Sequence, residues 1–147
     1  MRKIFIIAIA SLFFFSCEKE EDSFSDTPEI SFVKIYPLVV KEYKDKFFID
    51  ISYKDGNGDL GSADPDKTTI TVTDTRIGLD YRFRLRDLST PNGSTNIKGV
   101  LIIEMPPTAV LGDGKTSETA TFTVKMEDQK GNESNTIKTS EIKVEKE

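Results

Sequence analysis

Apolar residues recur at every second position in several short segments of this chain, and that period restricts the fold more than any other feature. The clearest case is FFIDISY, residues 47–53, in which every odd-numbered position is apolar or aromatic. Successive side chains of a β-strand point to opposite faces, so this alternation predicts a strand with one buried face. The segments that follow the N-terminal region show no helical period, and the expected class is therefore all-β.

Seven segments have this character, and turn-forming residues separate them. Four alternate clearly and three are β-branched runs; in chain order they are 30–40, 47–53, 68–73, 81–85, 97–105, 120–126 and 142–144. About seven short strands without a helix imply a single antiparallel β-sandwich. Pro37 interrupts the first segment and predicts an edge strand that bends or changes sheet, because proline cannot donate a ladder hydrogen bond.

A motif near the C-terminus indicates a particular type of β-sandwich. Residues 122–134, FTVKMEDQKGNES, resemble the strand and D-x-x-G-N-x-S turn near the end of many bacterial immunoglobulin-like domains. The resemblance implies an immunoglobulin-like or fibronectin type III sandwich. If its strands are lettered A to G, the B–C, D–E and F–G connections gather at one end; here they are 55–66, 88–96 and 128–134. Binding loops lie at that end in other proteins of this fold, so a protein or glycan partner is expected there, beside the start of strand A.

Residues 1–17 have the order of a secretory signal. Two basic residues precede a twelve-residue apolar run, Ile4–Phe15, and a small residue, Ser16, precedes the only cysteine, Cys17. A helix of twelve residues is roughly 18 Å long, whereas the hydrocarbon core of a membrane is ~30 Å thick. We therefore expect a signal peptide and export, and no membrane span.

The position of Cys17 resembles the lipobox of bacterial lipoproteins, in which the thiol is acylated and the cysteine becomes the mature N-terminus. Phe14 and Phe15 stand where that family prefers leucine and a small residue, and this aromatic-rich box is similar to those of Bacteroidota-type lipoproteins. A disulfide within the chain would need a second cysteine, and the sequence has none. The resemblance implies lipidation, such as palmitate, at Cys17 and a lipid anchor in the outer membrane.

An acidic stretch follows the cysteine. Residues 18–27 carry five acids and one lysine, so we expect a flexible tether that leads to a sandwich domain at 28–147. Within the tether, Lys19, Glu20 and Glu21 resemble the surface-export signal of the same group of lipoproteins, which implies exposure on the cell surface. The alternative is a solvated acidic linker of a protein that stays in the periplasm.

The amino-acid composition argues against several classes of function. Without residues 1–17 the chain has 18 basic and 25 acidic side chains, and the tether holds most of the excess, so the domain is close to balanced. Nucleic acid binding needs a basic surface that displaces counterions, and we expect none. The chain has no histidine, which excludes histidine-dependent triads and zinc sites built on histidine. Chemistry with paired carboxylates stays open, although no spacing identifies a pair.

Residues 55–66, DGNGDLGSADPD, place oxygen-bearing side chains at alternate positions and resemble a calcium loop. The candidate ligands are Asp55, Asn57, Asp59, Asp64 and Asp66. Calcium binds several oxygens, and carboxylates crowded in one loop repel each other unless a cation or water separates them. Leu60 stands where an EF-hand has its turn glycine, and Asp66 stands where an EF-hand has glutamate. The alternative is an Asx-rich turn that binds no metal.

The sequence therefore predicts a lipid-anchored, surface-exposed module of the bacterial outer membrane with no catalytic role, which acts in binding or in envelope structure. Two other hypotheses stay open. One is a calcium-stabilised accessory lipoprotein that binds a glycan or a protein, and the other is an envelope hydrolase with paired carboxylates. A binding module needs an accessible loop end, whereas an enzyme needs a concave site with two acids.

Overall fold

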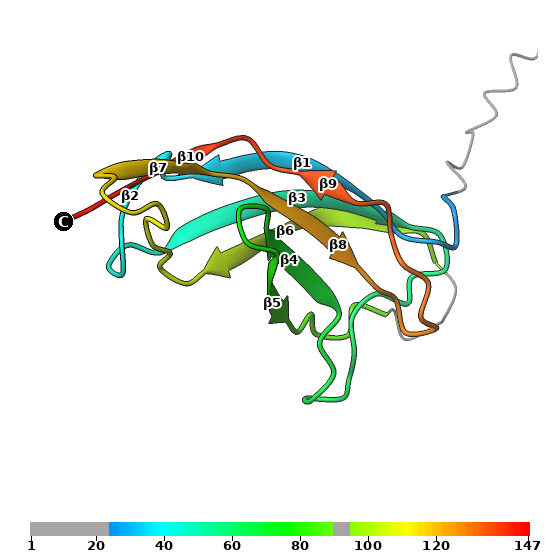
Figure 1. The fold of residues 1–147 in the computed structure, drawn as a ribbon. Coiled ribbons are helices and arrows are strands. Elements are labelled where there is room, and N and C mark those ends of the chain that lie inside the picture. Colours follow the sequence, from blue (N-terminus) through cyan, green and yellow to red (C-terminus); the bar gives the residue numbers. More distant parts are fainter. Residues whose placement is uncertain (1–23, 90–94) are drawn as a thin grey trace, which may run out of the picture.

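The computed structural model describes residues 24–89 and 95–147 (Figure 1). Within these ranges the chain forms ten strands and no helix, which confirms the all-β class. No helix of the described part is long and apolar enough to span a membrane. The predicted signal peptide, the predicted lipidation site Cys17 and the predicted export signal at Lys19, Glu20 and Glu21 lie outside the described residues.

Each of the seven predicted segments contains at least one strand. The strands are β1 (Glu29–Tyr36), β2 (Val39–Lys41), β3 (Phe47–Asp55), β4 (Ile70–Asp74), β5 (Leu79–Phe83), β6 (Ile97–Met105), β7 (Ser117–Ala120), β8 (Phe122–Met126), β9 (Ile137–Lys138) and β10 (Ile142–Glu145). The count exceeds seven because the first segment divides in two and because two further strands were not predicted: β7, which overlaps the sixth segment only at Ala120, and β9. The two-residue strand β9 has no alternation long enough to predict it.

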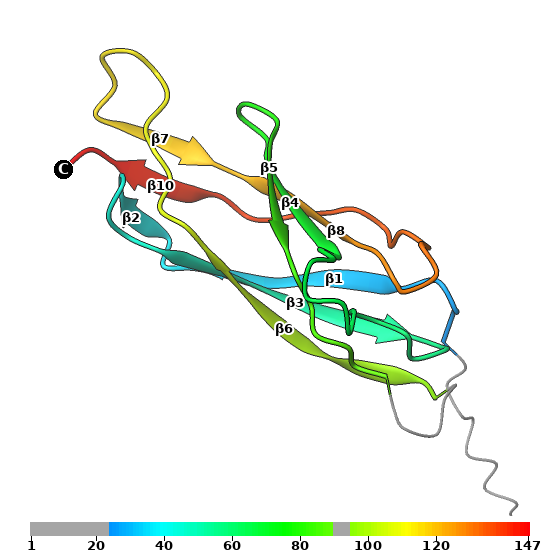
Figure 2. The same cartoon turned by 90° about the horizontal axis from the view of Figure 1, so that it is seen from below.

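The strands form three sheets, which we number in order of their first strand. The first sheet has the order β1-β3-β6, the second β2-β10-β7 and the third β5-β4-β8-β9. Thr121 alone separates β7 from β8, so the second and third sheets follow one another along the same stretch of chain. Figure 2 shows β1, β3 and β6 side by side, with β4, β5 and β8 crossing over them, and the arrangement is sandwich-like.

Pro37 divides the first predicted segment at the point where the chain changes sheet. Before it, β1 pairs antiparallel with β3 in the first sheet. After it, β2 pairs with β10 in the second sheet, with Val40 opposite Val144. The predicted change of sheet is confirmed. The β2–β10 pair is parallel, unlike the other strand pairs of the described residues, so the prediction of a purely antiparallel sandwich was wrong at this one position. After Pro37 the chain enters β2, which runs in the same direction as β10.

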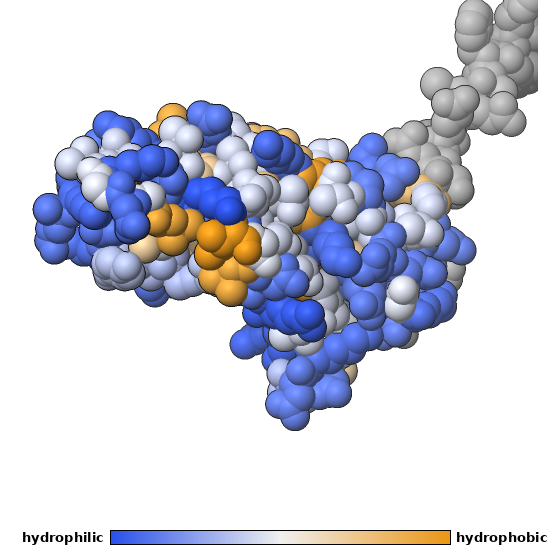
Figure 3. Space-filling model, viewed as in Figure 1, coloured by the Kyte–Doolittle hydropathy of each residue, from blue (hydrophilic) through white to orange (hydrophobic). Residues whose placement is uncertain are grey.

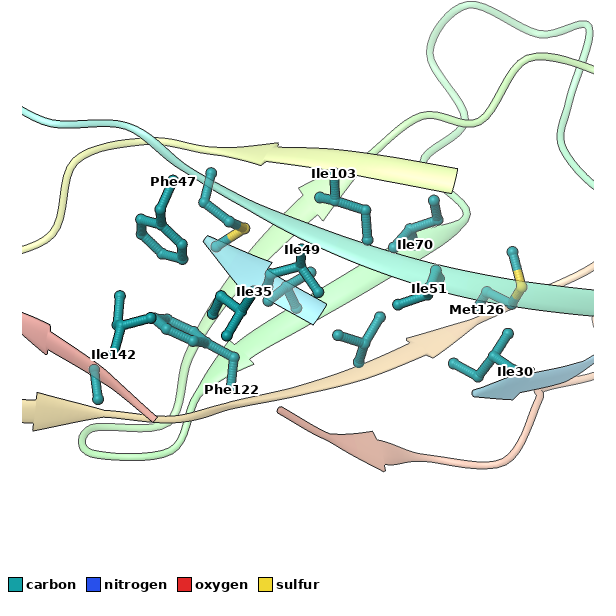
Figure 4. Packing of buried hydrophobic residues seen from close by; sticks show 14 of the residues in the cluster. Ile30, Ile35, Phe47, Ile49, Ile51, Ile70, Ile103, Phe122, Met126 and Ile142 are labelled. Atoms are coloured by element: carbon teal, nitrogen blue, oxygen red, sulfur yellow. The ribbon is translucent and has the colours of Figure 1, made fainter. Parts of the chain in front are cut away.

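The alternating apolar side chains meet between the first sheet and the other two. Phe47 of β3 and Phe122 of β8 are both fully buried, and their ring centroids lie 5.1 Å apart. Figure 4 shows Ile49, Ile51 and Ile103 of the first sheet in the same layer. A fully buried side chain of this size contributes about 1.5–3 kcal/mol to folding relative to an exposed one. This layer is the core of the domain.

A buried ion pair fastens the turn after β4 to the connection that follows β6. Asp74 is 1% exposed, and its carboxylate accepts hydrogen bonds from Nε and Nη2 of Arg76 at 2.6–3.2 Å. The same guanidinium donates to the hydroxyl of Thr108 and the carbonyl of Ala109. Burial opposes the charge of Arg76, but the hydrogen bonds and charge of Asp74, followed by those of Glu118, outweigh it and raise the pKa of Arg76.

We expect the substitution Arg76→Met to lower the free energy of unfolding by about 3 kcal/mol, because it leaves the Asp74 carboxylate buried without its counterion. Chemical denaturation of the domain measures this loss. The double variant Asp74→Asn/Arg76→Met should lose less than Arg76→Met alone, since neither charge remains.

Lys125→Met is the matched control, because Lys125 pairs with Glu133 at 2.6 Å on an exposed surface. Its loss should stay below about 1 kcal/mol. Equal losses in Arg76→Met and Lys125→Met would contradict a structural role for the buried pair.

Candidate functional site at the loop end

Three connections far apart in the sequence meet at one end of the sandwich. We call this region the loop end and define it as residues 55–66, 84–89 and 127–134. The amide of Leu88 donates to the carbonyl of Leu60 at 2.9 Å, and the amide of Gln129 donates to the carbonyl of Asp59 at 3.0 Å. The predicted gathering of these connections is therefore confirmed for the described residues.

The N-terminal segment of the domain enters beside the loop end, as the sequence predicts. The amide of Gly56 donates to the carbonyl of Ser25 at 2.8 Å. A Cβ at position 56 would lie 2.3 Å from the carbonyl oxygen of Phe24, so the crossing requires a glycine. The ammonium groups of Lys54 and Lys98 lie 5.4 and 5.8 Å from the centroid of the Phe24 ring. Any tether before residue 24 therefore joins the domain at the loop end.

Leu60 and Gly61 fix the middle of the 55–66 connection. Leu60 is fully buried and belongs to the core cluster. The residue that replaces the turn glycine of an EF-hand therefore anchors this loop to the core. Gly61 has a φ of +82°, and a Cβ there would lie 2.0 Å from the carbonyl oxygen of Arg86. The left-handed backbone and the close approach both select glycine. The loop consequently turns at this point, and its two halves leave in different directions.

The second half of the loop carries Asp64 and Asp66 on the exposed surface. The Asp64 carboxylate accepts the amide of Asp66 at 2.9 Å, which is an Asx turn. Arg84 holds this half through the backbone: its Nε donates to the carbonyl of Asp64 at 3.1 Å and its Nη2 to the carbonyl of Ser62 at 3.2 Å. The structure therefore places these two predicted calcium ligands apart from the other three.

The first half of the loop brings Asp55, Asn57 and Asp59 together. Asp55 is fully buried, and its Oδ2 accepts the amide of Asp59 at 2.9 Å. The Asn57 Oδ1 accepts the same amide at 3.3 Å. Within this half of the loop, Asp55 Oδ1, Asn57 Nδ2 and both carboxylate oxygens of Asp59 are buried without a hydrogen bond. The exposed side chain of Lys130 forms an ion pair with Asp59 Oδ2, with Nζ at 3.2 Å, whereas Asp55 Oδ1 has no hydrogen-bond partner.

Asp128, a residue that the sequence did not connect with this loop, adds a third negative charge. Burial raises the pKa of the Asp55 carboxyl, and the charges of Asp59 and Asp128 act in the same direction, while the amide of Asp59 opposes them. The motif that resembles immunoglobulin-like domains did mark Asp128, but as a turn residue. Three carboxylates thus lie close together although Asp128 is far along the chain from the other two.

The structure explains the D-x-x-G-N-x-S motif as a self-contained turn. Asp128 Oδ1 accepts the amides of Lys130 and Asn132 at 2.9 and 2.8 Å, and its Oδ2 accepts the Asn132 side-chain amide at 2.7 Å. Gly131 has a φ of +89°, and the hydroxyl of Ser134 accepts the amide of Met126 at 3.0 Å. Both oxygens of Asp128 already accept hydrogen bonds. The carboxylate oxygens of the loop end that are buried without a hydrogen bond therefore belong to Asp55 and Asp59.

This arrangement can attract a cation through a small number of ligands. In the part of the chain that the structure describes, no three Asp, Glu, His or Cys side chains are arranged to hold a metal ion together. A hard cation at this position would therefore bind the unpaired Oδ1 atoms of Asp55 and Asp59 and complete its shell with the Asn57 amide oxygen, backbone carbonyls or water. Fewer carboxylate ligands favour weak binding.

A polar surface hollow of about 190 Å³ lies over β4, β5 and β8 and contains several acids. Each of these acids already has a partner: Lys125 pairs with Glu133, Lys67 lies 3.4 Å from Glu127, and the Thr73 hydroxyl donates to Asp80 at 2.7 Å. The acids of this hollow are therefore engaged with neighbouring side chains.

A small apolar patch lies away from the loop end. Figure 3 shows a cluster of hydrophobic side chains near the β4–β5 turn. Ile77, Leu79 and Leu111 are each more than 40% exposed there and border a shallow hollow of about 210 Å³. This patch therefore differs in chemistry from the loop end, where carboxylates lie beside the N-terminal segment.

No family model, curated protein or solved structure matches this chain.

Proposed function

We propose that the chain is a lipid-anchored, non-catalytic binding or structural module of the bacterial outer membrane, exposed on the cell surface. The observation that carries the proposal is the position of Cys17, the only cysteine, directly after an apolar run and a small residue. Lys19, Glu20 and Glu21, which follow at once, support surface export. The lack of histidine and the paired state of the acids in the polar hollow support a role without catalysis.

The way the chain enters the domain bears on where a partner binds. Seven peptide units separate Cys17 from Phe24, and they can span at most about 25 Å. Ser25 is hydrogen-bonded to Gly56 in the loop end. An anchored domain therefore keeps its loop end close to the lipid, and a protein or glycan partner that binds these loops lies near the membrane surface. An integral membrane protein satisfies this geometry more readily than a soluble one.

We also infer that the sandwich is immunoglobulin-like, of the fibronectin type III form. The first sheet holds the first half of the first predicted segment and the second and fifth segments, and the other two sheets hold the remainder of the first segment and the third, fourth, sixth and seventh. The fourth segment, β5, pairs with β4. The division of strands supports the assignment, as does the D-x-x-G-N-x-S turn at residues 128–134.

A second candidate function is calcium-dependent stabilisation of the loop end, with the module as an accessory glycan- or protein-binding lipoprotein. The observation that favours it is the buried, unpaired Oδ1 of Asp55 beside the carboxylate of Asp59. A buried carboxylate oxygen without a partner is costly, and a divalent cation removes both that cost and the repulsion between the two groups. Asp64 and Asp66 are not ligands in this proposal because they face solvent.

The anchor is tested by the substitution Cys17→Ala in the full chain. Without the thiol there is no acylation, so the protein should leave the membrane fraction when cells are broken and fractionated. Phe15→Ala, which changes the signal but keeps Cys17, serves as the control and should stay in the membrane fraction. Membrane retention of Cys17→Ala would disprove the lipid anchor.

Surface export is tested by replacing Lys19, Glu20 and Glu21 together with alanine. We expect the triple variant to remain lipidated but to become resistant to protease added to intact cells, because it no longer carries the export signal. The control is Asp22→Ala/Asp26→Ala, which changes the same tether and leaves those three residues in place. If all variants are digested alike, the three residues are an ordinary linker.

Calcium binding is tested by thermal unfolding of residues 24–147 with EDTA and with about 1 mM calcium. For a dissociation constant of ~10⁻⁴ to 10⁻³ M, the cation should stabilise the domain by about 0.4–1.4 kcal/mol, a rise of a few degrees in Tm. Asp55→Asn/Asp59→Asn should abolish the rise, since it removes the negative charge of both candidate ligands.

Asp64→Asn/Asp66→Asn is the matched control, because it makes the same change of charge in the exposed half of the same loop. That variant should keep the full calcium response. If the wild type shows no calcium-dependent shift, or if both double variants lose it equally, the unpaired oxygens of Asp55 and Asp59 do not form a cation site.

A further inference from the structure

The first sheet ends in a long free edge. Strand β6 pairs with β3 along all nine of its residues, and no described strand pairs with its other side. An edge of this length, about 30 Å, presents a row of unpaired backbone N–H and C=O groups that can accept another strand. The other edge of the same sheet differs, because β1 has a bulge between Phe32 and Lys34. Bulges protect an edge against pairing.

The outer face of β6 carries exposed apolar side chains. Val100 is 58% exposed and Ile102 is 63% exposed, although both lie in the middle of a regular strand. Lys98 and Glu104 flank them on the same face. Soluble proteins usually protect an edge with central charges, proline or a short strand. Here the charges stand at the two ends of the face, and the middle is apolar.

We propose that β6 pairs with β6 of a second copy of the chain, antiparallel, about a twofold axis at Leu101. The strand Ile97–Met105 is centred on Leu101, so this register pairs its whole length. It places Val100 opposite Ile102 of the second copy and Lys98 opposite Glu104 of the second copy. By symmetry each pair occurs twice. Apolar and opposite-charge pairs directly across two strands both stabilise a sheet.

Self-complementarity selects this register over its neighbours. A twofold axis at Val100 would place Lys98 opposite Ile102, and an axis at Ile102 would place Glu104 opposite Val100; both leave a charge against an apolar side chain. Only the axis at Leu101 matches charge with opposite charge and apolar with apolar. Within one chain Glu104 already contacts Lys46, but its side chain is 53% exposed and can accept a second cation.

The pairing would join the two first sheets into one continuous sheet of six strands and remove both free β6 edges. Because the strands are antiparallel, the loop ends of the two copies lie at opposite ends of the joined sheet. The proposal is independent of the lipid anchor and of calcium, since it uses neither Cys17 nor the carboxylates of the loop end.

The test is the dissociation constant of the dimer for the full chain, extracted in mild detergent and measured by sedimentation. Lys98→Glu should weaken the dimer by about tenfold or more, because two attractive cross-strand pairs become repulsive. Lys98→Glu/Glu104→Lys should restore it, because the charges are exchanged and again opposite. The control is Lys54→Glu, which makes the same change on the same face and beside the same Phe24 ring, but on the central strand β3.

Oxidative cross-linking tests the register separately. Copies with Val100→Cys mixed with copies with Ile102→Cys should cross-link to each other faster than either cross-links to itself. A wild-type protein that stays monomeric at every concentration overturns the proposal. A dimer that responds equally to Lys98→Glu and Lys54→Glu, or that lacks the preferred cross-link, uses another surface and overturns it as well.

Discussion

The apolar layer between the sheets, which includes the Phe47–Phe122 contact, is the constraint on which the rest of the structure depends. A three-stranded sheet with one apolar face has marginal stability in water unless that face is covered. The first sheet is covered by the other two, and the chain crosses between them at Pro37. Stacking the sheets brings the ends of β3, β5 and β8 to one level, so the connections that follow these strands meet and form the loop end.

The molecule deals with buried charge in two different ways. At the end remote from the N-terminal segment, Asp74 and Arg76 form a complete pair, with the remaining donors of the guanidinium bound to Thr108 and Ala109. At the loop end, Asp55 is equally buried but lacks a cation and keeps one unpaired oxygen. The first arrangement rigidifies a connection. The second leaves capacity for a ligand, and it lies where the chain enters the domain.

Three surfaces then differ in what they suit. The loop end carries unpaired carboxylate oxygens and suits a cation, and under the proposed lipid anchor it also suits a membrane-proximal partner. The β6 edge, with its self-complementary order of charged and apolar side chains, suits a second copy. The mixed-charge face over β4, β5 and β8 is internally paired and suits neither.

The sequence by itself determined the local features. Alternation identified β3, β8 and parts of β5 and β10, a β-branched run identified β6, and Pro37 identified the change of sheet. The spacing of Asp55, Asn57 and Asp59 identified the carboxylate loop. These are local features, since a period of two reports only that a segment is a strand and which of its faces is buried. Tertiary structure decided the rest. Leu60 is buried in the core, and Asp64 lies in the exposed half of the loop, apart from Asp55. The turn after β8 places Asp128 close to Asp55 and Asp59. The pairing of β2 with β10 is parallel. These outcomes depend on which distant segments share the core, and a local pattern carries no information about that choice.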